Sequence, residues 1–496
     1  MKENITEKII LKAIRLNQLN AEKINTLKRD FLRNQKGIKH IPTTAELLKS
    51  YHKLVKLNKI KPKKTLEQAL VKRAVRTLSG VSIVTVLTKP FPCPGKCIYC
   101  PNDANMPKSY IADEPAAARA LTLKFDPYEQ VKRRIETLEN NGHSADKIEL
   151  IVKGGSWNAY PINYQYWFIL RCFEACNKSQ TKTTTNNLPL NELKKILTKA
   201  QTKNETAPHR IVGLTLETRP DLITTKTVET MRDLGCTRIE LGVQTIDEKI
   251  LQLIKRGHGT EAVKKSVELL RHYGYKVDFH LMPQLPGSTP TKDLKMLQEI
   301  FSNPAYRPDM IKIYPCTVVE NTELYDWFRT GKYKPYSDKK LIEVLKKFKS
   351  KVPVYVRISR LIRDIPGHHI QAGNRITNLR QVIQTEMAAE NLICRCLRCR
   401  EIGHQKIKTK KIKLKLFIEH YEASNGTEYF LSFEDNNRQA VFAFCRLRID
   451  SNGIYPAFIR ELHTYGQTLG IGERDKAANQ HKGLGKKLVI AAEKIA

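Results

Sequence analysis

The sequence has few acidic residues relative to its basic ones. It contains 50 Asp and Glu against 86 Lys and Arg, which gives a formal net charge of +36 and an isoelectric point of about 9.7. Such an excess favours a polyanionic partner, because cations that neutralise phosphates release condensed counterions. Nucleic acid is the leading candidate. A surface adapted to particular salt conditions and an anionic membrane are the alternatives.

Long apolar segments are also lacking. The first residues, Met1 to Lys8, have no signal-peptide core, and no later stretch is apolar over the length of a membrane span. We therefore expect a soluble, cytoplasmic protein without a membrane partner. The length of 496 residues and the hydrophobic content of 41% suit two to four globular domains with a large buried core.

A disulfide framework is not indicated, because six of the 11 cysteines lie in two tight groups. The first group is Cys93, Cys97 and Cys100, with the spacing C-x3-C-x2-C. Three thiolates can hold three irons of a 4Fe-4S cluster and leave the fourth iron open for S-adenosylmethionine (SAM). The alternatives are a zinc knuckle, which would lack a nearby fourth ligand, and three incidental cysteines.

From about residue 77 to 390, short β-rich runs alternate with helical patterns, which predicts parallel βα units of an α/β fold. The expected strands are 81–87, 148–152, 210–216, 237–241, 276–281 and 310–314. Ligands collect at the carboxyl ends of such strands. The candidate SAM-binding residues at these ends are Gly154, Gly155, Glu217, Arg219 and Gln244.

Each of these residues suits one part of SAM. Gly154 and Gly155 would let backbone carbonyls approach the amino group. Arg219 would form a fork with the carboxylate, and Glu217 would accept from an amine or a ribose hydroxyl. Gln244 is a neutral donor and acceptor. Each signal alone is weak, since a glycine pair is commonly a turn and Glu-x-Arg a surface pair.

Residues 1–76 combine apolar positions at helical spacing with many basic residues. We expect two or three helices, interrupted by a basic segment near 60–64. Leu47, Leu48, Tyr51, Leu54 and Val55 follow a helical repeat, so one face would be core while the other directs cations outward. This face is a candidate RNA-binding surface.

The second cysteine group, Cys394, Cys396 and Cys399, lies in the segment 391–412. Three thiolates with a fourth ligand can close a zinc tetrahedron, for which His404 or the distant Cys316 is the candidate. A redox-active or second iron-sulfur site and incidental cysteines are the alternatives.

Residues 413–496 are rich in expected strands, at 413–420, 428–434, 439–449 and 457–465, and end in a helical run. Gly483-Leu484-Gly485 opens this run and would present backbone N–H groups to an anion. Preceded by antiparallel strands, it is similar to the pyrophosphate loop of a GNAT acetyltransferase that binds acetyl-CoA.

The complete order of features resembles the Elongator catalytic subunit family, the tRNA uridine carboxymethyl transferases. The resemblance covers nearly the whole chain and is carried by five strings, which are Cys93-Pro94 with Cys97–Pro101, Phe125–Gln130, Glu217–Asp221, Gly235–Gln244 and Arg460–Gly466. It implies a partial (βα)6-type radical-SAM barrel at 77–390, a basic helical tRNA-binding region at 1–76, a zinc linker at 391–412 and a GNAT module at 413–496.

The resemblance also implies a reaction at the wobble uridine of tRNA, in the anticodon region. SAM would be cleaved to a 5'-deoxyadenosyl radical that abstracts hydrogen from the methyl of acetyl-CoA, and a carboxymethyl group would be left on carbon-5. Lys147 would contact acetyl-CoA from the radical domain. In the GNAT module the contacts would come from Glu461, Leu462, His463, Thr464, Leu484, Gly485 and Lys486. Residues 467–479 resemble the loop that covers this site.

One departure from the family is that the chain stops at Ala496, inside the helix after the pyrophosphate loop, where the family continues through further strands. The GNAT module is therefore expected to be incomplete, either because the sequence is a fragment, which we favour, or because the acetyltransferase half is impaired. The rival functions are a protein lysine acetyltransferase with a vestigial iron-sulfur site and a non-catalytic tRNA-binding scaffold. A homodimer or accessory subunits are compatible with the sequence.

Overall fold

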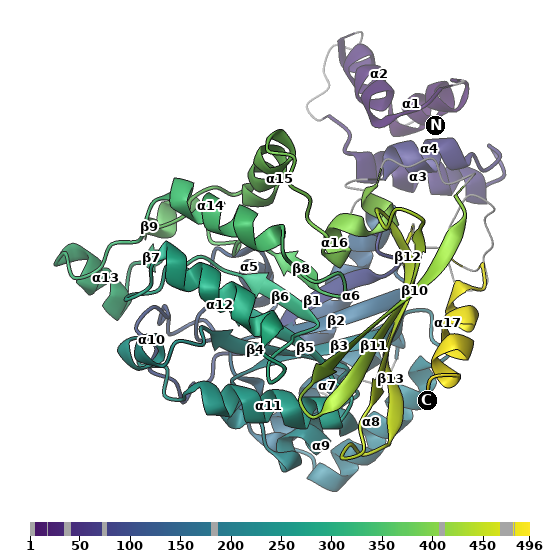
Figure 1. Ribbon diagram of the computed structural model, residues 1–496. Helices are drawn as coiled ribbons and strands as arrows, with labels where there is room; N and C mark the ends of the chain where they lie inside the picture. The colour runs from purple at the N-terminus through teal and green to yellow at the C-terminus, as the bar shows by residue number, and fades with distance from the viewer. Residues whose placement is uncertain are drawn as a thin grey trace.

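The computed structural model of the protein describes residues 5–16, 18–33, 41–71, 77–179, 187–405, 412–466, 480 and 482–496. The expected loop at 467–479 lies outside these residues. A small helical unit at the amino end packs above a large parallel sheet surrounded by helices, and a second, antiparallel sheet lies against the open side of the first (Figure 1). None of the described helices combines the length and the apolar character needed to cross a bilayer.

The described residues of the amino-terminal unit form four helices rather than two or three: α1 (Ile5–Ile14), α2 (Ala21–Arg33), α3 (Thr44–Lys56) and α4 (Lys64–Leu70). Helix α3 begins with a capping box, in which Thr43 and Glu46 satisfy each other's backbone N–H groups. The predicted apolar face is confirmed, since Leu47, Leu48 and Tyr51 are buried in a separate hydrophobic cluster of this unit. The lysines of α3 are exposed on the other side.

The basic segment before α4 differs from the expectation at Lys63. Its ammonium group donates to the carbonyl oxygens of Ile14, at 2.6 Å, and Leu16, at 2.8 Å, at the end of α1. A lysine at a helix carboxyl end satisfies free carbonyls and suits the helix dipole. Lys63 is therefore a structural contact of the helical unit, whereas Lys59 and Lys61 are exposed.

The large sheet contains seven parallel strands in the order β1-β2-β3-β4-β5-β6-β8. It is curled and open, which makes it a partial barrel. The strands are β1 (Ser82–Leu87), β2 (Lys147–Lys153), β3 (Arg210–Thr218), β4 (Arg238–Gln244), β5 (Lys276–Leu281), β6 (Met310–Ile313) and β8 (Arg357–Arg360). Six of them match predicted strands closely. The sheet has one strand more than the six expected. The additional strand, β8, was not predicted because its sequence, Arg-Ile-Ser-Arg, has a single apolar residue.

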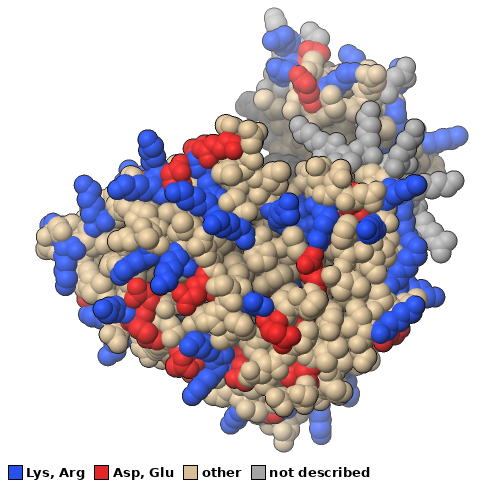
Figure 2. Space-filling view, viewed as in Figure 1, with Lys and Arg blue, Asp and Glu red and all other residues tan. Residues whose placement is uncertain are grey.

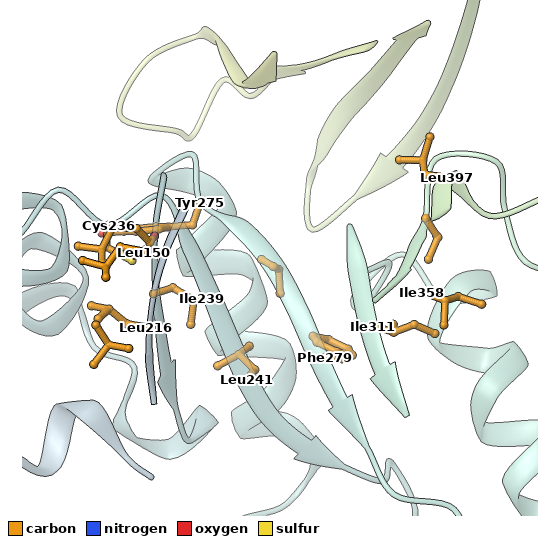
Figure 3. Packing of buried hydrophobic residues seen from close by; sticks show 14 of the residues in the cluster. Leu150, Leu216, Cys236, Ile239, Leu241, Tyr275, Phe279, Ile311, Ile358 and Leu397 are labelled. Atoms are coloured by element: carbon orange, nitrogen blue, oxygen red, sulfur yellow. Dashed lines mark hydrogen bonds between the residues drawn. The ribbon is translucent and has the colours of Figure 1, made fainter. Parts of the chain in front are cut away.

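Helices cover the outer face of this sheet, so apolar side chains of neighbouring strands form a continuous core. Leu150, Leu216, Ile239, Phe279 and Ile311 lie side by side across five strands (Figure 3). The helices of this part of the chain are α5 (Pro115–Thr122), α6 (Pro127–Asn140), α7 (Ile162–Cys176), α8 (Leu190–Asn204), α9 (Thr225–Asp233), α10 (Glu248–Leu253), α11 (Thr260–His272), α12 (Pro290–Ser302), α13 (Glu323–Arg329), α14 (Asp338–Lys349) and α15 (Leu379–Ala389), of which α10 and α13 pack in a separate hydrophobic cluster. The short strands β7 (Val318–Val319) and β9 (Ile370–Ala372) pair antiparallel.

The carboxyl-terminal strands form an antiparallel sheet in chain order, as predicted. They are β10 (Leu414–Ala423), β11 (Gly426–Asp435), β12 (Val441–Ile449) and β13 (Ala457–Thr464), and the short helix α16 (Leu397–Arg400) precedes them. Helix α17 (Leu484–Glu493) packs on β11, β12 and β13. Buried residues of this sheet belong to the same hydrophobic cluster as those of the barrel, so the two sheets share one core.

Buried ion pairs also join the two sheets. Arg460 of β13 donates to Asp309, which precedes β6, at 2.7 and 2.8 Å, and to Glu428 of β11. Arg271 of α11 donates to Glu428 at 2.6 Å, and Arg446 of β12 lies 3.5 Å from Asp309. These side chains are almost completely buried. Burial alone would raise the pKa of Asp309, but Arg460 and Arg271 hold it far below its usual value.

Removal of the Asp309 charge tests this junction. Asp309→Asn should lower the free energy of unfolding by about 3 kcal/mol or more, because Arg460 would keep a buried charge with an incomplete partner set. The exposed pair Glu261 and Lys264 provides a control, Glu261→Gln, with little expected effect. Urea unfolding at neutral pH measures both. Equal small effects of the two substitutions would contradict a stabilising junction.

The pH dependence follows from the lowered pKa of Asp309. Its contribution to stability is present above the pKa of an unfolded aspartate, about 3.9, and declines as the pH falls further below that value. The stability difference between the wild type and Asp309→Asn should therefore narrow in acid. Unfolding curves between about pH 3 and pH 7 measure this difference, and a constant difference would be inconsistent with it.

Candidate active site

A cavity of about 840 Å³ extends through the inside of the partial barrel. At one end it is lined by the cysteine loop that follows β1, including Cys93, Cys97 and Cys100, and at the other end by β13 of the antiparallel sheet, through Glu461 to Thr464. Two residue groups that the sequence assigned to different ligands, more than 350 positions apart, therefore line one cavity.

Strand β2 connects the two ends. Its burial alternates, so Ile148, Leu150 and Val152 are buried in the core while Lys147, Glu149, Ile151 and Lys153 line the cavity. Lys147 lies at the end that β13 lines, beside Gln480, and Lys153 lies at the carboxyl end of the strand. With about 3.3 Å per residue, the six steps between the two lysines span roughly 20 Å.

The three thiols of the cysteine loop lie in different local environments. Cys97 accepts a hydrogen bond from the guanidinium of Arg256 at 3.4 Å, and Cys93 accepts from the backbone N–H of Gly95 at 3.4 Å. Burial alone would raise the pKa of the Cys97 thiol, but Arg256 outweighs it and the pKa is lowered. Burial and the nearby Cys97 raise the pKa of Cys100 to about 12. One of the three sulfurs thus faces a cation from another segment, the one between α10 and α11.

The geometry of these sulfurs differs from that of a site for one ion. In the part of the chain that the structure describes, the thiols of Cys93, Cys97 and Cys100 do not all lie within 4.8 Å of one another. Ligands of a single zinc at about 2.3 Å must lie closer together than this. Thiols that bind separate irons of a cluster can be further apart. The donor set therefore fits a 4Fe-4S cluster better than a zinc knuckle.

The glycine pair after β2 has two different roles. Gly154 has a φ of +134°, a Cβ there would overlap Thr88, and its carbonyl oxygen accepts from the Tyr160 hydroxyl at 3.2 Å. Gly154 is therefore turned into the protein. Gly155 lines the cavity, so it is the glycine of the pair whose backbone a ligand can approach.

Arg219 lines the cavity, but most of its guanidinium is already bound. Nε and Nη2 form a bidentate pair with Asp221 at 2.9 and 3.0 Å, and Nη2 also donates to the carbonyl of Arg256. Nη1 is buried without a hydrogen-bond partner among the described residues and lies against Gly95 of the cysteine loop. The predicted fork onto a carboxylate would require loss of the Asp221 pair or of the bond to the Arg256 carbonyl, whereas a single bond from Nη1 would require neither.

Glu217 and Gln244 line the cavity as expected. Glu217 accepts from the Tyr110 hydroxyl at 3.0 Å and lies 3.1 Å from the ammonium of Lys153. Burial alone would raise the pKa of Glu217, but Lys153 and His280 hold it below its usual value. Gln244 ends β4 with a φ of +70°, and its carbonyl accepts from the N–H of Met282 at 2.8 Å.

A charged network beside Glu217 was not anticipated from the sequence. Glu240 of β4 is fully buried and pairs with Lys153, Lys312 and His280, the last at 2.9 Å. Burial lowers the pKa of Lys312 to about 8, although Glu240 opposes this effect. Lys153, Lys312 and His280 also line the cavity. Each member lies between apolar or glycine neighbours in the sequence, so no local sequence signal groups them.

The other end of the cavity is formed by β13 and Lys147. Glu461 accepts from Arg446 at 2.9 Å and lies 3.3 Å from the ammonium of Lys276, and these charges outweigh burial and lower its pKa to about 2. His463 lies 2.7 Å from the carbonyl of Ser79. Lys147 donates to Gln480 at 3.0 Å, and burial lowers its pKa. Glu461, Leu462, His463 and Thr464 all line the cavity.

The predicted pyrophosphate loop lies beside this end. Gly483 has a φ of +76° and is the N-cap of α17, which begins at Leu484. Leu484, Gly485 and Lys486 are in the first turn of the helix but are absent from the cavity lining, and Lys486 is exposed. A Cβ on Gly485 would contact Leu462 at 3.8 Å, so the helix start lies against β13.

Comparisons with known proteins agree with this arrangement. Residues 92–300 match the radical SAM superfamily, and residues 308–389 match the radical SAM C-terminal domain. A tRNA uridine(34) acetyltransferase of Methanocaldococcus infernus is 43% identical over 513 residues, covering 99% of this chain and 92% of that protein. Elongator complex protein 3 of Schizosaccharomyces pombe is 36% identical over 455 residues, covering 88% of this chain and 81% of that protein.

A solved structure, that of the archaeal Methanocaldococcus infernus Elp3 with an N-terminal deletion, matches with a TM-score of 0.71 at 42% identity, over 84% of this chain and 91% of that one. The chain belongs to the Elongator complex protein 3 family of radical SAM enzymes. The family relationship confirms the resemblance and the partial barrel inferred from the sequence. Membership in the radical SAM superfamily implies a 4Fe-4S cluster and SAM, which the donor set of the cysteine loop fits.

The second cysteine group of this family member is compact. The sulfurs of Cys394, Cys396 and Cys399 lie within 4.8 Å of one another, as ligands of one ion must. Among the described residues neither His404 nor Cys316 completes the group. His404 lies 3.7 Å from Glu401, and Cys316 is buried with Ile98 in a different hydrophobic cluster. The buried ammonium of Lys349 donates to Cys394 at 3.3 Å.

The contact between Arg256 and Cys97 gives a prediction for the cluster of this radical SAM enzyme. Arg256→Gln should shift the midpoint potential of the cluster to a more negative value, because a cation that donates to a ligating thiolate stabilises the reduced, more negative state. Redox titration followed by electron paramagnetic resonance measures the shift. Arg256→Lys should retain part of the effect.

The exposed Arg329 on α13 provides the control, since Arg329→Gln removes the same charge away from the cavity. An unchanged potential in Arg256→Gln, with normal iron content, would show that the hydrogen bond has no electronic effect.

Proposed function

We propose that this enzyme modifies the wobble uridine, uridine 34, of tRNA by adding a carboxymethyl group from acetyl-CoA to carbon-5. The names of the relatives, tRNA uridine(34) acetyltransferase and Elongator complex protein 3, support this proposal. The observation that carries it is the single cavity, because the cysteine loop and β13 line its two ends. A transfer between two cofactors requires that their reacting groups share one enclosed site.

SAM would bind at the end of the cavity that the cysteine loop lines. Cys93, Cys97 and Cys100 would bind three irons, and the cluster with SAM would supply hydrogen-abstracting radical chemistry. The side chains here serve to bind and orient. Gly155 would admit the amino group to the backbone, while Glu217 and Gln244 would contact polar groups of the same ligand. Gly154 would support this turn from behind, and Arg219 would contribute through Nη1.

The GNAT end of the cavity would bind acetyl-CoA. The strand residues Glu461, Leu462, His463 and Thr464 would pair with the pantetheine arm, and Leu484, Gly485 and Lys486 would hold the pyrophosphate at the start of α17. Lys147 would contact the acyl end from the barrel side, because it is the basic side chain of β2 at this end. Its bond to Gln480, which in turn donates to the carbonyl of Thr464 in β13, supports this placement.

The domain limits predicted from the sequence assign each ligand to its own segment of the chain. Residues 77–390 would form the radical-SAM unit, 391–412 the zinc linker and 413–496 the GNAT unit. In the linker, Cys394, Cys396 and Cys399 would supply three of four zinc ligands. Residues 1–76 would bind tRNA, together with basic side chains that are numerous on the molecular surface (Figure 2).

The role of Lys147 is tested by separating the two half-reactions. With a loaded cluster, reductant, SAM, acetyl-CoA and tRNA, Lys147→Met should lower carboxymethyluridine formation at least about tenfold, because loss of a polar contact to the acyl group costs about 1.4 kcal/mol or more. Formation of 5'-deoxyadenosine from SAM should stay within a few-fold. Mass spectrometry measures both products.

The exposed Lys132 on α6 serves as the matched control, and Lys132→Met should leave both products unchanged. Equal loss of both products in Lys147→Met would argue against separate SAM and acetyl-CoA ends of the cavity. An unchanged yield of carboxymethyluridine would show that Lys147 is not part of the acetyl-CoA site.

The role of the amino-terminal unit is tested through salt dependence. The double substitution Lys59→Gln and Lys61→Gln should weaken tRNA binding. It should also reduce the magnitude of the slope of log K against log salt by about 1 to 2, because binding releases fewer counterions when phosphate contacts are lost. The exposed pair Lys195 and Lys199 on α8 is the charge-matched control. Filter binding between about 50 and 200 mM salt measures the slopes, and equal slopes for both double variants would refute a specific tRNA contact by this unit.

A further inference from the structure

Three side chains from two distant segments of the chain converge next to the cavity. His368 and His369 each place Nε2 next to the same carboxylate oxygen of Asp113, at 3.4 and 3.0 Å. Consecutive side chains usually diverge, but these two rings lie with centroids 4.2 Å apart. One ligand atom from each of the three residues lies within 4.8 Å of the others. The arrangement is thus a convergent set of two imidazoles and one carboxylate.

The backbone segments that carry these residues are fixed to each other. The guanidinium of Arg363 donates to Glu114 at 2.7 Å and also to the carbonyl of Ser109, so it joins the segment of Asp113 to the segment that leads to the histidines. The two histidines end a short 3-10 helix (Gly367–His369) directly before β9, which pairs with β7. A site that is held in place before binding loses little conformational entropy when a ligand arrives.

We propose that Asp113, His368 and His369 form a binding site for a divalent transition-metal ion, separate from the cluster and from the cysteine group. Two imidazole nitrogens and one carboxylate oxygen suit zinc, nickel, cobalt or iron(II), whereas magnesium and calcium prefer oxygen ligands only. Neutral imidazoles bind the ion through Nε2 and lose the hydrogen bonds to Asp113, whose charge the ion then neutralises.

The position of the site gives it a consequence for the cavity. Glu114, Arg363 and Asp364 line the cavity next to the proposed ligands, and all three ligands are accessible to solvent to some extent. Three protein ligands leave coordination positions open. An ion here would add positive charge at the rim and would clamp the segment after the cysteine loop to the segment before β9.

The test uses the untagged, full-length protein with its cluster and its cysteine group already loaded. Isothermal titration with Ni²⁺ should detect one additional site in the wild type, and Asp113→Asn, His368→Gln and His369→Gln should each weaken it at least tenfold. Excess Mg²⁺ should not compete. The exposed His420 on β10 is the control, and His420→Gln should bind Ni²⁺ as the wild type does.

Two results would overturn the proposal. One is an unchanged Ni²⁺ affinity in the Asp113 and His369 variants, and the other is an equal loss in His420→Gln, which would indicate unspecific binding to surface histidines. Thermal unfolding of the metal-free variants checks that they fold, and Ni²⁺ should raise the melting temperature of the wild type and of His420→Gln only. The outcome is independent of the proposed tRNA reaction, since it measures binding of the ion alone.

Discussion

The buried contacts of Asp309 and Glu428 with Arg460 fix how the two halves of this enzyme sit together. A charge that is removed from water must be paired with good geometry, since loss of one partner leaves the other uncompensated. Here the acids come from the barrel and from β11, while Arg460 comes from β13, the strand that lines the cavity. The pairing therefore holds β13 in place against the barrel. Hydrophobic packing across the shared core supplies area, but it is not directional.

Strand β13 lines one end of the cavity inside the barrel, and side chains of β2 line the cavity from that end to the other. The alternation of β2 directs one row of side chains, three of them charged, toward the cavity and buries the opposite row against the helices. Polar groups inside a barrel are costly unless they are paired, and Glu240 with Lys153, Lys312 and His280 meets this requirement near the cysteine end. The interior can thus hold polar ligands along its length while the outer core stays apolar.

Much of the fold could be predicted from the sequence, because strand and helix periodicities are local. Six of the seven parallel strands and the four antiparallel ones were found, and the cysteine spacing identified the loop at the carboxyl end of β1. Strand β8 was missed, since Ile358 is its only apolar residue. Contacts between residues distant in the chain could not be predicted from the sequence, because they depend on tertiary packing. Examples are the contacts of Lys63 with the end of α1, of Glu240 with its cationic partners, and of Asp113 with the two histidines. The ion pair between Arg219 and Asp221 could have been predicted from the sequence, because the two residues are only two positions apart.

If the cysteine end and the β13 end form one reaction space, the adenosyl carbon and the acetyl methyl should meet in the same cavity. An assay with SAM, reductant, tRNA and acetyl-CoA that carries three deuterium atoms on its methyl group tests this directly. Deuterium should then appear in the 5'-deoxyadenosine that is released. Unlabelled 5'-deoxyadenosine, formed alongside carboxymethyluridine, would contradict it.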